Sequence, residues 1–160
     1  MVGPPADVHP VLRRAPAPPA ALDLLAQAER GLEEAETRED PGDAYIAAHM
    51  AALRTAAAVL AVRGRPETTA RGRRRIRSVW DMLPEIAPEL AEWSVLFAAS
   101  GARRARLEAG IRREVDRRDA DELVASVAMF LRLVRSQISP QPVLPRDPNR
   151  PEPGEGERPA

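Results

Sequence analysis

The chain has 160 residues, enough for one domain of ordinary size. Its 24 basic and 24 acidic residues balance, so net charge neither favours nor excludes a polyanionic partner. The absence of cysteine excludes disulfides, thiolate catalysis and thiolate metal sites, and fits a reducing compartment. We expect a cytoplasmic protein without a membrane partner, because no apolar run of signal-peptide type or of membrane-spanning length stands out.

Proline is concentrated at both ends of the chain, where aromatic residues are absent. Segments of this composition bury too little apolar surface to offset the entropy that ordering them would cost. We therefore predict disordered tails at residues 1–19 and 139–160, on either side of one helical domain at residues 20–138.

Two helices are expected in the first half of this domain. After residue 20, alanine and leucine recur at alternating steps of four and three, the spacing of one helical face. These positions are Ala21, Leu25, Ala28, Leu32 and Ala35. Pro41 and Gly42 then mark a break, Asp43 is the expected N-cap of a second helix, and Gly64 is its expected end.

The second helix is apolar around most of its girth. One stripe consists of Ile46, Met50, Leu53, Ala57 and Leu60, and a second stripe beside it consists of Tyr45, Ala52, Ala56 and Val59. A helix with two such stripes is typically the central helix of a bundle.

The sequence of the second half of the domain predicts a short helix followed by two long ones. Ser78 can cap the short helix, and Pro88 is a good first residue for the first long helix, which is expected to end at Gly110. Asp116 and Asp119 form a capping-box-like pair before the last helix. No segment has the period-two pattern of a strand. The predicted fold is all-α, an up-and-down bundle of four principal helices with a short fifth.

His49 is the one histidine inside the predicted domain, because His9 lies in the N-terminal tail. One interpretation makes it a polar residue that is hydrogen-bonded at a seam between helices. The other makes it a general base, with Arg54 or an arginine of the loop after the second helix holding phosphate, an arrangement suited to RNA cleavage without a metal. No calcium-type carboxylate loop, zinc-type histidine pair or glycine-rich phosphate loop is present, so we expect no metal and no cofactor.

The arginines between residues 63 and 77 are the strongest candidates for a nucleic-acid contact, because guanidinium groups suit bidentate binding of phosphate. The alternative is a solvated loop, or one paired with the acidic first helix, since no aromatic residue interleaves with these arginines to stack on bases. The residues are Arg63, Arg65, Arg71, Arg73, Arg74, Arg75 and Arg77. A second arginine-rich segment, residues 103–118, would extend the surface if both segments lay at one end of the bundle.

The order of these elements resembles a known family. Its most specific part is "SVWDMLPEIAPELAEW" at residues 78–93, with "AYIAAHMAALRTAAAVLA" before the arginines and "DRRDADELVASVAMFLRLV" after it. Over residues 20–138 these features resemble the small stand-alone HEPN-domain proteins of actinobacteria. The resemblance implies an all-helical bundle that tends to homodimerise. It also implies a superfamily linked to RNA cleavage, toxin–antitoxin systems and partnership with nucleotidyltransferases.

Catalytic members of that superfamily carry an arginine followed, after a few intervening residues, by a histidine near the start of the last major helix. Residues 111–138 contain no histidine, so the resemblance transfers no catalytic residue. We expect a non-catalytic, dimeric binding protein that contacts RNA or a protein partner, and the alternative is a metal-independent ribonuclease around His49. The candidate anchors of a dimer interface, which could equally be core residues, are Tyr45, Met50, Trp80 and Trp93.

Overall fold

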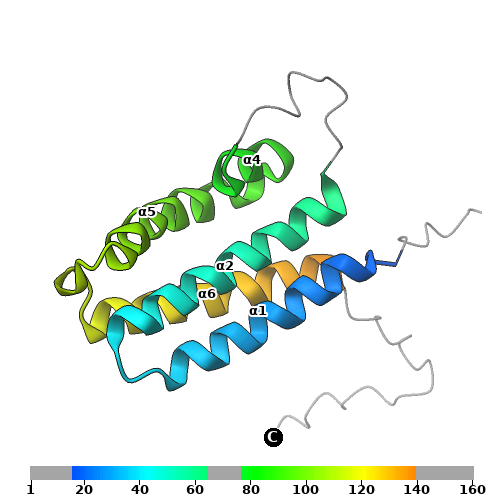
Figure 1. The fold of residues 1–160 in the computed structure, drawn as a ribbon. Coiled ribbons are helices and arrows are strands. Elements are labelled where there is room, and N and C mark those ends of the chain that lie inside the picture. The colour runs from blue at the N-terminus through cyan, green and yellow to red at the C-terminus, as the bar shows by residue number, and fades with distance from the viewer. Residues whose placement is uncertain (1–15, 65–76, 140–160) are drawn as a thin grey trace, which may run out of the picture.

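The computed structural model describes residues 16–64 and 77–139, and every regular element in these two ranges is a helix (Figure 1). The α-helices are α1 (Pro19–Thr37), α2 (Pro41–Arg63), α4 (Val79–Ile86), α5 (Ala91–Glu108) and α6 (Arg117–Ile138), with short 3₁₀ turns at Pro88–Leu90 and Arg112–Glu114. Their up-and-down arrangement confirms the predicted all-α bundle, and α4 is the predicted short fifth helix. The predicted tails fall almost wholly outside the described residues.

Helix α2 is the central element of the bundle. It packs against α1 and α6 in one layer and against α4 and α5 in the other (Figure 1). The residues that it buries against these neighbours are mostly alanine, and six of them, each at most 1% exposed, are Ala44, Ala48, Ala51, Ala52, Ala56 and Ala58. Small side chains let neighbouring helix backbones approach closely, because the distance between helix axes is set by the side chains at the contact.

The two apolar stripes predicted on α2 have different surroundings. The stripe that contains Tyr45 and Val59 is buried, whereas the stripe that contains Ile46, Met50 and Leu53 is only half-buried. One side of the central helix therefore remains partly open to solvent.

The length and composition of α2 also suit a membrane span, contrary to what we expected from the sequence. The helix has 23 residues, and the mean hydropathy of its most apolar stretch is 1.5. Half of that stretch is buried inside the bundle. The core helix of a globular domain passes the same test of length and hydropathy, and the packing of α2 against four other helices is what such a core helix shows.

The large side chains of the core come mainly from the helices around α2. The rings of Phe97 on α5 and Phe130 on α6 are fully buried, with their centroids 5.1 Å apart. Trp80 on α4 and Trp93 at the start of α5 lie 5.3 and 5.9 Å from Phe97. This aromatic cluster joins α4, α5 and α6. Tyr45 and Trp80 are 4% and 8% exposed, so neither can anchor a dimer interface as the sequence suggested.

The helix caps largely follow the sequence prediction. Ser78 and Asp116 cap α4 and α6, each in a complete capping box. The predicted cap of α2 was wrong by three residues, because Asp40 is the N-cap and the backbone N–H of Asp43 donates to its carboxylate at 2.9 Å. Pro41 starts the helix instead of breaking the chain before it, since the fixed φ of proline suits the first helical position.

We predict that Phe97→Ala lowers the free energy of unfolding by about 3–5 kcal/mol, because it leaves a cavity among three aromatic rings. Urea unfolding followed by circular dichroism measures the loss. Leu22→Ala on α1, where the side chain is 45% exposed, is the matched control and should cost no more than about 1 kcal/mol. Equal losses in the two variants would contradict the central role of the aromatic cluster.

Candidate functional site

His49 lies buried between α2 and α5 and is 2% exposed. Its Nδ1 atom is 2.7 Å from the hydroxyl of Ser100, and its ring centroid is 6.0 Å from that of Trp80 in an edge-on arrangement. A Cβ atom at position 101 would lie 3.2 Å from the Cε1 atom of His49, so Gly101 gives the imidazole room against α5.

The hydrogen bonds around Ser100 determine which nitrogen of His49 carries the proton. The Ser100 hydroxyl donates to the carbonyl of Phe97 at 2.9 Å. Because that hydroxyl has only one hydrogen, it must accept from His49, and Nδ1 is therefore the protonated nitrogen.

Burial, and to a smaller extent the positive charge of Arg104, lower the pKa of His49 from 6.5 to about 4, against a smaller opposing effect of Glu108. The imidazole is therefore neutral near pH 7. A base with so low a pKa is poorly matched to proton transfer at that pH.

The structure does not bring His49 and Arg54 together, which corrects the version of the alternative catalytic site that uses Arg54. Five residues of an α-helix turn through roughly 500°, so the two side chains leave α2 about 140° apart. His49 faces α5, whereas the Nη1 atom of Arg54 lies 3.1 Å from the place where a Cβ of Gly31 on α1 would be.

The candidate nucleic-acid segment is described only at its two ends. Arg63 forms an ion pair with Glu89 and a 3.3 Å hydrogen bond with Gln137. Arg77 binds the carboxylate of Glu85 with two nitrogens, one at 3.0 Å. Both arginines thus have intramolecular anionic partners. The other predicted contacts lie outside the described residues, and they are Arg65, Arg71, Arg73, Arg74 and Arg75.

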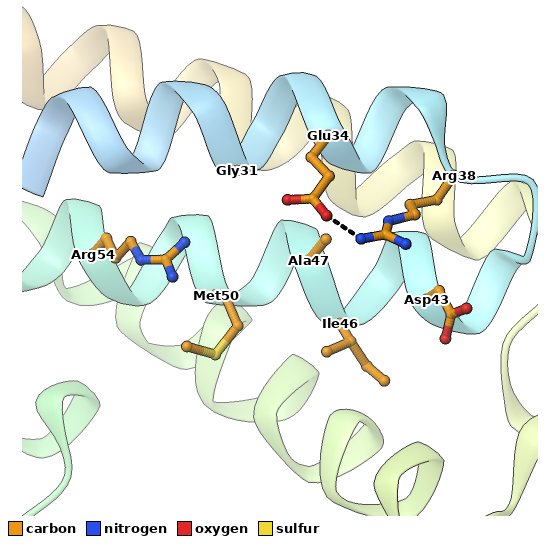
Figure 2. A pocket seen from close by; sticks show the side chains of 8 residues that line it. All are labelled: Gly31, Glu34, Arg38, Asp43, Ile46, Ala47, Met50 and Arg54. Atoms are coloured by element: carbon orange, nitrogen blue, oxygen red, sulfur yellow. Dashed lines mark hydrogen bonds and ion pairs between the residues drawn. The ribbon is translucent and has the colours of Figure 1, made fainter.

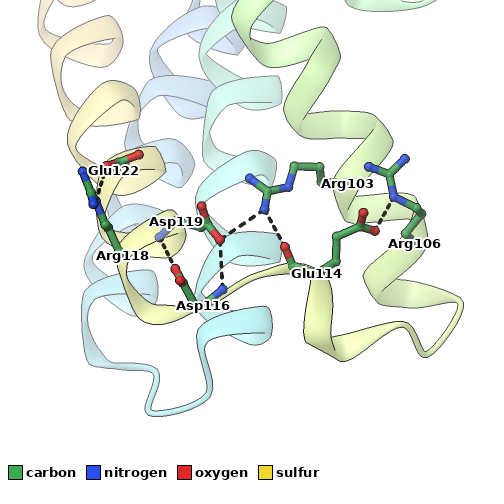
Figure 3. Close-up of polar contacts among 7 residues, drawn as sticks. All are labelled: Arg103, Arg106, Glu114, Asp116, Arg118, Asp119 and Glu122. Atoms are coloured by element: carbon green, nitrogen blue, oxygen red, sulfur yellow. Dashed lines mark hydrogen bonds and ion pairs between the residues drawn. The ribbon is translucent and has the colours of Figure 1, made fainter.

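The second arginine-rich segment is largely neutralised by carboxylates (Figure 3). Arg103 contacts Asp119 at 3.1 Å and the backbone carbonyl of Glu114, while Arg106 pairs with the Glu114 side chain. Arg103 also lies 5.4 Å from the ring centroid of Tyr45. These contacts tie α5 to the starts of α2 and α6. Further pairs along the segment are Arg104–Glu108, Arg112–Asp43 and Arg118–Glu122.

The two arginine-rich segments do not share one end of the bundle. Arg112 pairs with Asp40 and Asp43 at the start of α2, whereas Arg63 is the last residue of that helix. A helix of 23 residues separates its ends by roughly 33 Å. The larger phosphate-binding surface that the sequence suggested is therefore not formed by the described arginines.

Two surface features were missed in the sequence. The first is a groove lined by residues of α1 and α2, among them Ile46 and Met50, with Arg54 at one end (Figure 2). The second is a set of four exposed apolar residues, two on α5 and two on α6, which we call the α5–α6 patch. Its members are Val95, Leu96, Met129 and Leu133. The sequence did contain a signal for the groove, because Gly31 interrupts an otherwise strong helical pattern.

A model of the SAV_6107-like HEPN family matches residues 35–135. The protein belongs to the HEPN superfamily. The resemblance noted in the sequence is thereby confirmed. No curated protein matches the chain, and no solved structure does.

In this HEPN protein the last long helix, α6, contains no histidine, so the expected catalytic pair is missing from its place in the fold. Within residues 16–64 and 77–139, no three His, Cys, Asp or Glu side chains are placed to hold a metal ion together.

We predict that acid destabilises the protein through His49. The folded-state pKa is about 4 and the ordinary value is 6.5, so the unfolded chain binds this proton more readily than the folded one. The contribution of neutral His49 to stability is complete above pH 6.5 and is lost as the pH falls toward about 4, a change of about 3 kcal/mol.

The measurement is the free energy of unfolding at pH 7, 6, 5 and 4 for the protein and for His49→Gln, which removes the titration. The difference between the two should shrink or reverse as the pH falls. A difference that stays constant over this range would contradict the shifted pKa, because carboxylates titrate alike in both proteins.

Proposed function

We propose that this HEPN protein acts by binding and not by catalysis. The observation that supports this most directly is the environment of His49, which is neutral, buried and hydrogen-bonded to Ser100. A general base must reach the proton that it removes, directly or through one water. At 2% exposure, and with Nδ1 already donating to Ser100, His49 is a structural residue of the α2–α5 contact.

We further propose that the protein forms a homodimer through the α5–α6 patch. Val95, Leu96, Met129 and Leu133 are 74%, 40%, 54% and 37% exposed. The rings of Trp93 and Phe130 lie 5.4 Å apart, so the aromatic cluster links the part of α5 that carries Val95 and Leu96 to the part of α6 that carries Met129 and Leu133. Exposed apolar residues gathered in this way mark interaction surfaces more often than residues scattered singly. Two copies of the patch would shield one another from water.

We predict that Met129→Glu, alone or with Leu96→Glu, converts the dimer to a monomer at micromolar concentration, because a carboxylate would be buried in an apolar interface. Analytical ultracentrifugation over a concentration series measures the dissociation constant, which should rise at least tenfold. Leu22→Glu, an equally drastic change at an exposed leucine of α1, should leave it unchanged.

The dimer proposal fails if the unaltered protein is monomeric at all concentrations. It also fails if the patch variants dimerise as well as Leu22→Glu does. Circular dichroism of each variant separates loss of association from loss of the fold.

RNA contact by residues 63–77 stays a prediction. The proposal that the protein binds without catalysis predicts that RNA is not cleaved. A labelled RNA pool incubated with the protein and a chelator should remain intact, and His49→Gln should behave identically. If the arginines contact RNA, affinity should fall steeply with salt, because each phosphate contact releases counterions. Changing Arg71, Arg73, Arg74 and Arg75 to alanine should then abolish the gel shift.

The matched control changes Arg30, Arg113 and Arg132 to alanine, three exposed arginines on other parts of the described surface. RNA breakdown that survives chelation and disappears in His49→Gln would contradict the non-catalytic proposal. Absence of binding at low salt would remove RNA as the partner and leave protein association.

A further inference from the structure

The groove between α1 and α2 is a hollow of about 390 Å³. Figure 2 shows Ile46, Ala47 and Met50 along α2, Arg54 at one end, and the ion pair between Glu34 and Arg38 near the other. The volume lies near the lower end of the roughly 300–1,000 Å³ typical of small-ligand pockets, which are mostly apolar with a few polar groups. This surface is separate from the α5–α6 patch and from His49.

Arg54 is the residue of the groove whose environment points to a bound anion. Four arginines in residues 16–64 and 77–139 are half-buried. Three of them hold carboxylates, in the pairs Arg77–Glu85, Arg103–Asp119 and Arg104–Glu108. Arg54 is the fourth, and within the described ranges it has no ion pair and no hydrogen bond from its guanidinium group. A partly desolvated cation without an anion is costly, because each lost contact with water is not replaced.

Gly31 gives Arg54 its place in the groove. A glycine inside a helix costs roughly 0.5–1 kcal/mol relative to alanine, so its presence in the middle of α1 calls for a packing reason. A Cβ atom at this position would lie 3.1 Å from Nη1 of Arg54, which is closer than ordinary packing. The missing side chain thus lets the guanidinium lie along α1, at the end of the apolar floor, with its donors on the groove side of the helix.

We propose that this groove binds a small amphiphile with a single carboxylate head and an alkyl body. The planar guanidinium of Arg54 matches a carboxylate with two parallel hydrogen bonds. The alkyl body would lie on Ile46, Ala47 and Met50, which are all half-buried in the free protein. Among the described residues, the opposite end offers no unpaired cation to a second negative charge on the ligand, because Arg38 is already paired with Glu34 there.

The test measures binding of sodium decanoate to the full chain by titration followed with amide NMR, below the concentration at which decanoate forms micelles. Decan-1-ol and decyltrimethylammonium are the comparison ligands, with the same chain and a neutral or cationic head. We expect saturable binding of decanoate, with the largest shifts at residues 46–54. The alcohol should bind at least tenfold more weakly, because it lacks the charge-assisted contact.

Arg54→Gln should weaken decanoate binding at least tenfold, whereas Arg132→Gln, which removes an exposed arginine of α6, should change it less than twofold. Gly31→Ala is a second test, because it favours the helix while pushing the Arg54 guanidinium aside, and it should also weaken binding. The proposal is overturned by equal binding of the cationic amphiphile, by an unchanged affinity in Arg54→Gln, or by no saturable binding at all.

Discussion

The close packing of α2 against its neighbours is the constraint on which the rest of the structure depends. Alanine covers the faces of this helix that meet α1 and α6, so the helices approach closely. The large side chains that fill the core must therefore come from other helices. Phe97, Phe130, Trp80 and Trp93 supply them from α4, α5 and α6. Where α5 crosses α2, Gly101 leaves space for His49, which becomes part of the core. The burial of this histidine is thus a consequence of how tightly α2 is enclosed.

Ion pairing at the end of the bundle where α5 meets α6 bears on whether the arginines there can bind phosphate. Arg103, Arg106 and Arg112 hold the turn between α5 and α6 against the start of α2 through carboxylates and backbone carbonyls. Exposed ion pairs of this kind contribute modestly to stability, each typically below about 1 kcal/mol. They nevertheless occupy the guanidinium groups that a phosphate would need. An arginine-rich segment is therefore a poor guide to nucleic-acid binding when acidic residues are equally abundant, as they are in this chain.

Arg54 and the α5–α6 patch show the opposite situation, because there the groups have no partner among the described residues. The α2 stripe that contains Ile46 and Met50 remains half-buried, and α5 and α6 carry exposed apolar residues in addition to the aromatic cluster that joins these helices. For a HEPN protein with no catalytic pair in α6, these two surfaces are where binding is best supported. They lie on different helices, so the proposed dimerisation and the proposed ligand binding can be tested separately.

The amino-acid sequence by itself determined the helices, the caps at Ser78 and Asp116, and membership of the HEPN superfamily. Helical periodicity and capping act between residues three or four positions apart, so they can be recognised without the fold. Only the tertiary structure decided the environments of the functional candidates. His49 meets Ser100 across 51 positions of sequence, and Arg112 meets Asp43 across 69. Contacts over such separations depend on which helix faces pack together, and local pattern does not specify that.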